Sequence, residues 1–573
     1  MARQIDQDEE HAMNYTDRPW LKSYMLGPYK LDYSLDPYPQ KPLFEILDRS
    51  ASEFPNQTAI LFKGQEIKYH QLKRRVDSLA NGLIKLGLEK GDRVCIFLPN
   101  CPEYIISFWG ILRAGGVVVP TSILRTDEGL HHEVSRSHSR FIICQQANLD
   151  RALALISGSD LQGILLTSQA SFLGDQVEGP LPGRVYDFGS MLTEPDPIPP
   201  HVVIDPMHDL CQLAFTGGAT GTPKGVMLTH YNGYASIVQT LPWFMKPLLG
   251  GVRGKTSVLL SIPMFHVYGN FIQTTSVYLG MRLLVLPDAR DTDALLASII
   301  DHRPFLVPGV PTQFMRLADA GLKRSNSMLF SGSAPLPQEV AAEIKRKTGM
   351  SVSEGYGLTE TTSVAHINLT SFSRIMGFMA KEKPGIGVPL PDTECRLADP
   401  ETGLDVPVGK PGEVVIRGPQ VMLGYWPEPG SGLTADGWLH TGDIGVMDEA
   451  GYFQIVDRMK DMVNVSGFKV YTTEVDEVLF KHPAVATAAA FGIPDPDIPG
   501  SERVIAVVAL KDGYKGSVTE SEIRDFCRQH LSPYAVPKVV EFRDQLPLTV
   551  TEKVFKNALR AQAIARMKSQ KEG

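Results

Sequence analysis

The stretch "LAFTGGATGTPKGVMLTH", Leu213 to His230, carries the strongest chemical signal in the chain. Apolar residues flank it, and glycines and threonines fill its centre ahead of a lone lysine, Lys224. Backbone N–H groups of such a loop, together with the hydroxyls of Thr216, Thr220 and Thr222, can surround phosphate oxygens. A glycine-rich hairpin tip without a ligand is the alternative. The Thr-Pro-Lys-Gly sequence that follows favours phosphate.

This loop differs from the common nucleotide-binding P-loop. A Walker-type loop needs GxxxxGK followed directly by Ser or Thr, and its lysine opens a helix. Here Pro223 precedes Lys224 and Gly225 follows it. We therefore predict that Lys224 does not lie on the first turn of a helix.

The composition predicts a large, multi-domain cytoplasmic protein. The 573 residues are 43% hydrophobic, enough for two to four domains with substantial cores. The net charge of −8 lacks the basic footprint of a nucleic-acid binder. Six cysteines lie far apart without a CxxC pair, which argues against zinc ribbons and thioredoxin-like chemistry and fits a reducing compartment.

The N-terminal residues and the distribution of apolar residues bear on targeting and on membrane contact. The first residues, "MARQIDQDEEHAM", are acidic and lack the apolar stretch of a secretory signal. No run approaches 18 apolar residues, so we expect no spanning helix, while peripheral membrane contact stays open. Residues 1–40, rich in Pro and Tyr, predict an extended arm on the domain or on a partner subunit of a homodimer. A disordered tail is the alternative.

Residues 41–458 alternate between apolar strands and amphipathic helices. "TAILFKGQEIKY" predicts two strands turning at Gly64, and Val76, Leu79 and Leu83 recur at helical spacing before a C-terminal glycine, Gly87. Short apolar strands follow at "RVCIFLP", "VVVP", "SRFIICQQ", "GILLTS", "SVLLSIP" and "MRLLVLP". This pattern predicts an α/β domain with parallel-rich sheets layered with helices.

Residues 459–573 predict a small α+β domain. "IGVMDEAGYFQIVDR" reads as an antiparallel hairpin that ends just before the boundary, near residues 457–460. Beyond it come a helix at "TTEVDEVLFKHP", a strand at "RVIAVVAL", and a helix opened by a capping box from Thr519 to Glu522. The chain thus divides into an arm, a large domain and a small C-terminal domain.

"TGGATGTPKG" resembles the phosphate loop of the adenylate-forming superfamily, which includes acyl-CoA synthetases. Its Thr-Gly-Gly form is similar to that of bacterial long-chain fatty acyl-CoA synthetases. Further motifs agree in family order, and the resemblance covers nearly the whole chain beyond residue 40. They are "PMFHVYG" (263–269), "FSGSAPLP" (330–337), "SEGYGLTETT" (353–362), "GWLHTGDIG" (437–445), "VDRMKD" (456–461), "VNVSGFKV" (463–470) and "LPLTVTEKVFKNALR" (546–560).

The resemblance implies sites for ATP and coenzyme A. Tyr356 would stack on adenine, Asp443 would accept from both ribose hydroxyls, and Arg458 would contact ribose or phosphate. The loop near Gly467 would meet the pantetheine arm. The matching positions are Thr216, Gly217, Gly218, Thr220, Gly221, Thr222, Lys224, Gly332, Ser333, Ala334, Pro335, Glu354, Gly355, Tyr356, Gly357, Thr359, Asp443, Ile455, Arg458, Gly467, Phe468 and Lys469.

It also implies the groups that act on the reactants. Lys553, His266, Thr216 and Glu360 match catalytic positions, and Thr359 with Glu360 would hold Mg²⁺. The substrate pocket would include His266, Tyr268, Gly332, Gly357 and Thr362, with its floor near Asn270, Phe271 and "VPGVPTQF". A structural histidine, a helix cap at Thr-Glu and a solvated lysine are the simpler alternatives.

The C-terminal motif departs from the family at one position. The residue before the catalytic lysine is usually Gly, and here it is Glu552, which could stiffen the loop or place a carboxylate beside Lys553. Lys556 is a nearby alternative for the catalytic lysine. Lys460 matches the hinge about which the small domain turns.

The function implied is ATP-dependent ligation of a carboxylic acid to CoA. The acid and ATP would give acyl-AMP and pyrophosphate, and CoA would then displace AMP after the small domain rotates. A fatty acid is the preferred substrate, and an aryl or cyclic acid is the alternative. A carrier-protein thiol could replace CoA, and a non-catalytic acyl-nucleotide or lipid-binding regulator is the rival of another class.

Overall fold

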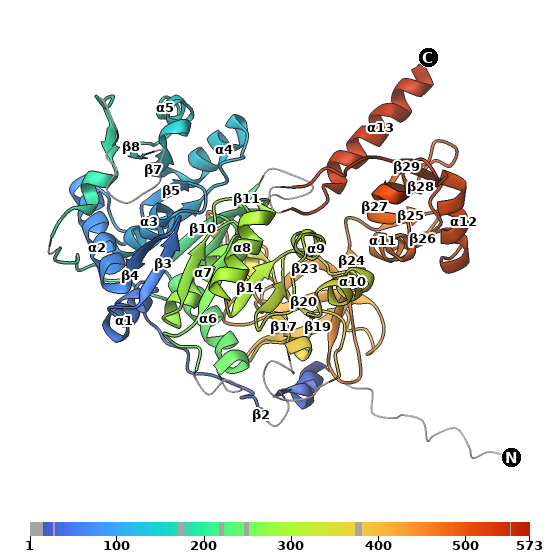
Figure 1. Cartoon of the computed structure of the whole chain (residues 1–573), viewed down its shortest axis with the longest axis horizontal. Coiled ribbons are helices and arrows are strands. Elements are labelled where there is room, and N and C mark those ends of the chain that lie inside the picture. Colours follow the sequence, from blue (N-terminus) through green and yellow to red (C-terminus); the bar gives the residue numbers. More distant parts are fainter. Residues whose placement is uncertain are drawn as a thin grey trace.

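The computed structural model describes residues 15–26, 29–168, 177, 180–195, 197–216, 223–245, 251–372, 381–549 and 552–572. Two nine-stranded sheets dominate the large N-terminal part (Figure 1). The order of one is β22-β21-β11-β10-β6-β5-β7-β8-β9, and that of the other is β18-β17-β16-β15-β14-β12-β13-β3-β4. Most neighbouring pairs are parallel, and the antiparallel pairs lie towards the edges, as expected for a parallel-rich α/β domain.

The strands of the first sheet are β5 (Arg93–Phe97), β6 (Val117–Pro120), β7 (Ser139–Gln145), β8 (Gly163–Thr167), β9 (Val185–Asp187), β10 (Leu210–Thr216), β11 (Lys224–Thr229), β21 (Gly424–Tyr425) and β22 (Glu428–Pro429). Those of the second are β3 (Thr58–Phe62), β4 (Gln65–Lys68), β12 (Ser257–Leu260), β13 (Arg282–Val285), β14 (Leu306–Gly309), β15 (Met328–Ser331), β16 (Val352–Tyr356), β17 (His366–Asn368) and β18 (Val388–Pro389). The α-helices of this part are α1 (Glu45–Glu53), α2 (Tyr69–Lys85), α3 (Pro102–Arg113), α4 (Asp127–Ser137), α5 (Leu149–Ile156), α6 (His230–Met245), α7 (Val267–Tyr278), α8 (Thr292–His302), α9 (Pro311–Asp319) and α10 (Gln338–Thr348).

The large part has five layers, in which two sheets alternate with three groups of helices. The alternation of side chains along each strand shows which helices each sheet face contacts. On β5, Val94 and Ile96 belong to the core shared with α1, α2, α3 and α7, which lie between the two sheets. Their neighbours Cys95 and Phe97 point the other way, into a core with α4 and α5. On the far side of the second sheet, α8, α9 and α10 cover a third core. Both faces of each sheet are thus buried, which explains why the central strands read as continuous apolar runs.

A four-stranded antiparallel sheet completes the large part. It contains β19 (Glu394–Ala398), β20 (Gly412–Arg417), β23 (Leu439–Met447) and β24 (Phe453–Arg458) in that order. The predicted hairpin is confirmed: β23 and β24 pair antiparallel, and Asp443 lies opposite Arg458. This register brings a carboxylate and a guanidinium together at the end of the large part.

The C-terminal unit is α+β, as expected. Its elements are β25 (Val463–Val465), β26 (Phe468–Val470), α11 (Thr472–Lys481), β27 (Val485–Pro494), β28 (Glu502–Leu510), α12 (Glu520–His530), β29 (Val539–Phe542) and α13 (Lys556–Glu572). The capping contact is present, since the Thr519 side chain accepts a hydrogen bond from the Glu522 N–H. This unit has its own core under α11 and α12, and α13 packs on the other face of its sheet. The boundary near Arg458 stays a prediction.

The arm lies on its own chain and is less extended than expected. Short 3₁₀ helices η1 (Tyr15–Asp17) and η2 (Pro19–Ser23) precede a two-stranded ribbon of β1 (Met25–Leu26) and β2 (Tyr29–Lys30). Pro19 has its φ preset for a first helical position, which favours the turn. Trp20 is buried against Phe453, and the Tyr24 hydroxyl donates to the Pro389 carbonyl at 2.6 Å.

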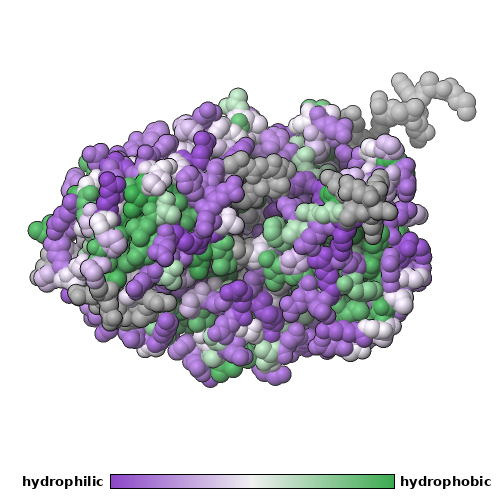
Figure 2. Space-filling view, turned by 90° about the horizontal axis from the view of Figure 1, so that it is seen from above, coloured by the Kyte–Doolittle hydropathy of each residue, from purple (hydrophilic) through white to green (hydrophobic). Residues whose placement is uncertain are grey.

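One face of the molecule is largely hydrophilic. Figure 2 shows one face on which hydrophilic residues predominate and hydrophobic residues gather in a few places. Within the described part of the chain, none of the helices is both long and apolar enough to cross a bilayer.

Candidate active site

The phosphate loop joins two antiparallel strands. β10 and β11 pair so that Thr216 lies opposite Lys224. Lys224 begins β11 and therefore does not open a helix, as predicted from Pro223 and Gly225. Its ammonium nitrogen lies 4.9 Å from the centre of the Tyr425 ring. The residues between them that the sequence assigned to phosphate, Gly217, Gly218, Thr220, Gly221 and Thr222, fall outside the described residues.

Asp443 is the centre of the expected ribose site. Its buried carboxylate accepts from the Tyr356 hydroxyl at 2.7 Å through Oδ2, and the Arg458 Nε lies 3.2 Å from Oδ1. Each carboxylate oxygen has a further lone pair, so this arrangement can still accept from a vicinal diol. Burial and the Asp443 charge raise the pKa of Tyr356 far above its usual value, and the phenol stays protonated as a donor.

Glycines around Tyr356 allow the close packing of this region. A Cβ on Gly355 would lie 2.6 Å from the Phe330 ring, and one on Gly357 would lie 1.8 Å from the Ser363 carbonyl oxygen. Gly332 faces Tyr268, whose ring would be 3.0 Å from an added Cβ. The glycines are therefore needed for packing, independently of any ligand.

The segment after β15 leads towards this region. Gly332 donates its N–H to the Gly309 carbonyl, and Ser333 adopts a positive φ of 68°. Ala334 and Pro335 continue the loop towards α10. The Leu336 N–H, one residue further on, donates to the Glu354 carboxylate at 3.2 Å. Burial raises the pKa of Glu354 to about 7, with a smaller contribution from the Glu477 charge.

Thr359 and Glu360 begin the 3₁₀ helix η5 (Thr359–Thr361). The Tyr425 hydroxyl donates to Glu360 Oε1 at 2.9 Å, and the Glu360 carbonyl accepts from the Met422 N–H. In the described residues, no group of three or more His, Cys, Asp or Glu side chains could hold a metal. One carboxylate beside one hydroxyl nevertheless fits Mg²⁺, which takes few protein ligands and completes its shell with phosphate oxygens and water.

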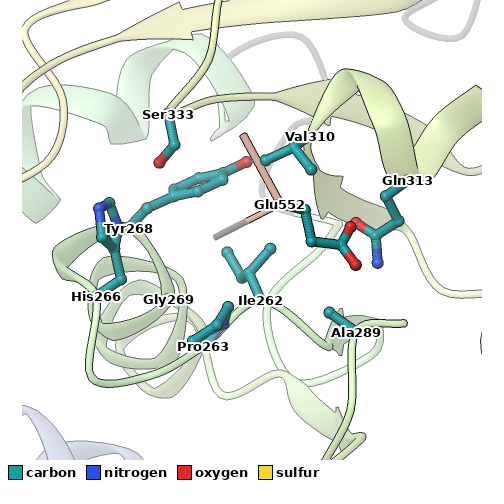
Figure 3. Close-up of a pocket in the computed structure, with 10 residues that line it drawn as sticks. All are labelled: Ile262, Pro263, His266, Tyr268, Gly269, Ala289, Val310, Gln313, Ser333 and Glu552. Atoms are coloured by element: carbon teal, nitrogen blue, oxygen red, sulfur yellow. Dashed lines mark hydrogen bonds between the residues drawn. The ribbon is translucent and has the colours of Figure 1, made fainter. Parts of the chain in front are cut away.

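A small pocket opens at the start of α7 (Figure 3). His266 is the N-cap of this helix, and Tyr268 crosses the pocket with its hydroxyl donating to the Phe330 carbonyl at 2.9 Å. The lining residues are Ile262, Pro263, His266, Tyr268, Gly269, Ala289, Val310, Gln313, Ser333 and Glu552. Most of these are apolar or present ring and backbone surface, which suits the body of an acid rather than its charge.

His266 is neutral in this environment. Burial, followed by the positive charge of Lys553, lowers its pKa to about 3. Its Nδ1 accepts from the Tyr268 N–H at 3.3 Å. A neutral ring that accepts at Nδ1 carries its proton on Nε2, so His266 can donate a hydrogen bond to developing negative charge.

Lys553 lies in the same electrostatic environment. Burial and the nearby cation Arg458 lower its pKa to about 7, Asp443 opposes this shift, and Lys460 adds to it. The alternative lysine has another role. The Lys556 ammonium pairs with the Asp476 carboxylate at 2.8 Å, inside the C-terminal unit. The geometry therefore favours Lys553 over Lys556 for contact with a ligand.

Other residues assigned to the site lie outside the lining of this pocket, and their assigned roles stay predictions. The Thr362 hydroxyl donates to the Gln420 carbonyl at 2.7 Å, and neither Thr362 nor Gly357 lines the pocket. Asn270 pairs with Gln212 at 2.6 Å. Ile455 lies on β24 against the core, and Lys460 follows β24 in a turn. Gly467, Phe468 and Lys469 form the tip and return strand of the β25–β26 hairpin, outside the pocket lining.

The main contact missed from the sequence involves Glu552. Its carboxylate accepts two hydrogen bonds from Arg316 on α9, at 2.9 and 3.1 Å, and does not pair with Lys553. The unusual residue in the motif was a visible signal, but nothing in the sequence identified its partner 236 residues away.

Comparisons with known proteins identify the family of this chain. The family model "AMP-binding enzyme" matches residues 47–426, and "AMP-binding enzyme C-terminal domain" matches residues 474–553. The chain is 38% identical to a long-chain-fatty-acid–CoA ligase of Bacillus subtilis, covering 95% of this chain and 98% of that protein. It is 33% identical to a feruloyl-CoA synthase of Amycolatopsis, with 89% and 97% coverage.

A solved structure also shares the fold of this chain. ATP-bound MatB from Rhodopseudomonas palustris superposes with a TM-score of 0.80 at 28% identity, covering 91% of this chain and 98% of that one. The two family models match the segments that supply Tyr356 on one side and Lys553 on the other. From the motifs, the layered fold and these matches together, we conclude that the chain belongs to the family of AMP-binding enzymes.

Proposed function

We propose that this chain is an ATP-dependent ligase that joins a long-chain fatty acid to CoA. In the first step the carboxylate attacks the α-phosphorus of ATP and displaces pyrophosphate. In the second step the CoA thiol attacks the acyl carbon and AMP leaves. The curated relatives named long-chain-fatty-acid–CoA ligase, matched over nearly their full length, support the acid class.

One observation carries the proposal. The Lys553 ammonium, from the C-terminal segment, lies where its charge acts on His266 and where Asp443 and Arg458 act on it. His266, Asp443 and Lys553 come from widely separated parts of the sequence. A cation held near a carboxylate and a buried imidazole is an arrangement that suits a reaction between two anions.

The physical task of the first step is to bring a carboxylate to a triphosphate. Lys553 and Lys224 would neutralise phosphate charge, and Mg²⁺ at Thr359 and Glu360 would add to this effect when bound. His266 would donate from Nε2 to the oxygen between the acyl group and phosphorus. Positioning and fixed charges of this kind supply most of the acceleration in phosphate chemistry.

The second step would need a different face of the C-terminal unit. The hairpin tip at Gly467 carries Phe468, which is exposed and stacks on Tyr534 with ring centroids 4.7 Å apart. Lys469 pairs with Glu401 at 3.3 Å. We propose that rotation about Lys460 removes Lys553 and turns this hairpin towards the acyl-adenylate, so that CoA approaches along it.

A panel of acids tests the proposal. The purified chain would be incubated with ATP, Mg²⁺ and saturated fatty acids of increasing length, with and without CoA, and AMP and acyl-CoA would be measured. We expect CoA-dependent AMP release to be largest with long-chain acids. Because a feruloyl-CoA synthase is among the relatives, ferulate and anthranilate belong in the panel. Higher kcat/KM with these aromatic acids would contradict the fatty-acid assignment.

A further inference from the structure

We propose that the ion pair between Glu552 and Arg316 is a latch that holds the C-terminal segment in the orientation for adenylate formation. Glu552 is thereby a positioning residue for Lys553. The inference rests on the proposed function, since it concerns how the chain divides its time between the two half-reactions. The latch consists of Glu552, which departs from the usual motif, and Arg316 on α9.

The contact is geometrically strong. One guanidinium nitrogen of Arg316 reaches both carboxylate oxygens of Glu552, at 2.9 and 3.1 Å. The same Arg316 is fixed from behind, because it also donates to the Ala289 carbonyl at 3.0 Å and to the Thr292 hydroxyl at 3.3 Å. The guanidinium is therefore already oriented when the glutamate arrives, which reduces the entropy lost on pairing.

The backbone of Glu552 is held as well. The Thr312 hydroxyl, on the first turn of α9, donates to the Glu552 carbonyl at 3.1 Å. Side chain and main chain of one residue are thus bound to the same helix of the large part. Lys553 is the next residue, and neighbouring Cα atoms are about 3.8 Å apart, so fixing Glu552 fixes the origin of the lysine side chain.

The glutamate occupies a backbone conformation that favours glycine. Its φ is +59°, in the left-handed region, where the Cβ of an ordinary residue is crowded. A glycine would adopt this conformation without that cost. The contact with Arg316 is the feature of this structure that offsets it.

Because Glu552 is buried, its ion pair with Arg316 depends on the orientation of the C-terminal segment. The side chain is 6% exposed, and burial raises the pKa of its carboxyl while Arg316 opposes the shift. The other charges that act on it, Arg290 and Asp288, pair with each other. A buried carboxylate is unfavourable without its partner. When the C-terminal segment moves away from Arg316, Glu552 must therefore become exposed to water.

The pair therefore stabilises one orientation and not the other. An interaction shifts an equilibrium between two states only if its free energy differs between those states. With Lys553 at the site the ion pair is formed, and after rotation it is broken. Removing it is expected to slow adenylate formation while leaving thioester formation from acyl-adenylate unchanged or faster.

Two substitutions test the latch from its two sides. Glu552→Gln keeps the size and the backbone problem but removes the charge, and Arg316→Met removes the partner while leaving the motif intact. Arg346→Met is the matched control, because Arg346 forms an exposed ion pair within α10. The measurements are ATP–pyrophosphate exchange and CoA-dependent thioester formation from preformed acyl-adenylate.

We expect both substitutions to lower the kcat of exchange about tenfold, within the usual range of coupling between sites, with KM for ATP changed less than about twofold. The double variant should lose no more than either single one. Arg346→Met should match the unmodified chain. Exchange at the unmodified rate, or an equal fall in both half-reactions, would refute the latch.

A second measurement does not depend on activity. All six native cysteines are buried, so cysteines placed at exposed Ile300 and Tyr514 can be labelled selectively for energy transfer. We expect one dominant distance in the unmodified chain and a broader distribution in Glu552→Gln. An unchanged distribution would overturn the inference. Absence of CoA-dependent AMP release from the unmodified chain would instead overturn the proposed function, so the two failures are distinguishable.

Discussion

At the scale of single residues, Lys553 is poised between two charge states. It is buried, cations at Arg458 and Lys460 disfavour its charge, and Asp443 favours it, which leaves its pKa at about 7. A lysine in this condition gains most from a polyanion, because the phosphates of ATP both stabilise its charge and supply a partner. This environment of Lys553 is what we expect of a lysine that contacts a nucleotide.

Lys553→Ala should separate the two half-reactions. We expect ATP–pyrophosphate exchange to fall by about two to three orders of magnitude, the effect of removing one group that stabilises transition-state charge. Thioester formation from preformed acyl-adenylate should persist if, as we propose, the lysine acts only in the first step. Lys556→Ala provides the contrast, since Lys556 pairs with Asp476 and should affect stability before catalysis. Equal loss in both half-reactions would show that Lys553 is structural.

Binding of ATP should take up a proton above neutral pH. In the free protein Lys553 is mostly neutral at pH 8, about one unit above its pKa, and the phosphates should raise that pKa and charge it. Uptake of up to about 0.9 proton per ATP is expected at pH 8, falling towards zero at pH 6, where the lysine is already protonated. Titration calorimetry in buffers of different ionisation enthalpy measures this. Uptake that persists in Lys553→Ala would assign the proton to another group.

At the scale of elements, the start of α7 positions the pocket in which we propose that the acid binds. His266 caps the helix and Tyr268 lies in its first turn, so both side chains move with this end. Gly269 lets the helix approach the preceding strand connection, because a Cβ there would lie 2.2 Å from the Pro263 carbonyl oxygen. The pocket therefore depends on a backbone approach that only glycine allows at this position.

Gly269→Ala should displace the start of α7. We expect a destabilisation of about 1–3 kcal/mol, as for overpacking in a close-packed region, and a higher KM for the acid. Gly513→Ala is the control, because an added Cβ there meets nothing within 4 Å and its φ is not positive. Chemical denaturation and steady-state kinetics provide the readouts. A KM equal to that of the Gly513 variant would show that α7 tolerates the methyl group.

The turn after β24 is the second element with a predicted role. Lys460 lies between Met459, whose N–H donates to the Gly442 carbonyl, and Asp461, whose N–H donates to the Arg458 carbonyl. Lys460→Pro fixes φ at this point and restricts the residue before it. Adenylate formation should remain within about threefold, whereas thioester formation should slow by about tenfold or more. Loss of adenylation instead would place the pivot elsewhere.

At the scale of the whole molecule, elements that depend on local sequence could be predicted, whereas contacts between distant segments could not. The helix around Val76, Leu79 and Leu83, the β23–β24 hairpin and the cap at Thr519 were predictable, because each depends on residues close in sequence. Sheet order was not: β6 lies between β5 and β10, although β10 begins about 90 residues after β6 ends. Ordering strands requires knowing which helical faces fill the layers between them.

The same limit applies to the site. Motif positions identified His266, Tyr268, Asp443 and Lys553, because each motif has a fixed local sequence. Apolar lining residues such as Ile262 and Ala289 carry no such signature, and their place in the pocket depends on how two distant loops meet. The partner of Glu552 was unpredictable for the same reason.

The arm joins parts of the large domain that are distant in sequence. Trp20 is 1% exposed and lies with its ring 6.1 Å from that of Phe453, while Arg18 pairs with Glu394 at 2.8 Å. Gly451 allows this approach, since a Cβ there would lie 2.2 Å from the Trp20 Cα. Trp20, Tyr24 and Tyr38 of the arm are buried within the chain, so docking on a partner subunit is not needed to bury them.

Trp20→Ala tests whether the arm stabilises the large domain. Removing a fully buried indole should cost about 3–5 kcal/mol, because it leaves a cavity against Phe453 and the β23–β24 turn. Calorimetry should show a lower melting temperature for the large domain, while the C-terminal unit, with its separate core, melts as before. Sedimentation should show the same oligomeric state for both proteins. A change in association with unaltered melting would mean instead that the arm acts between subunits, because a residue that packs only on its own domain can change stability without changing assembly.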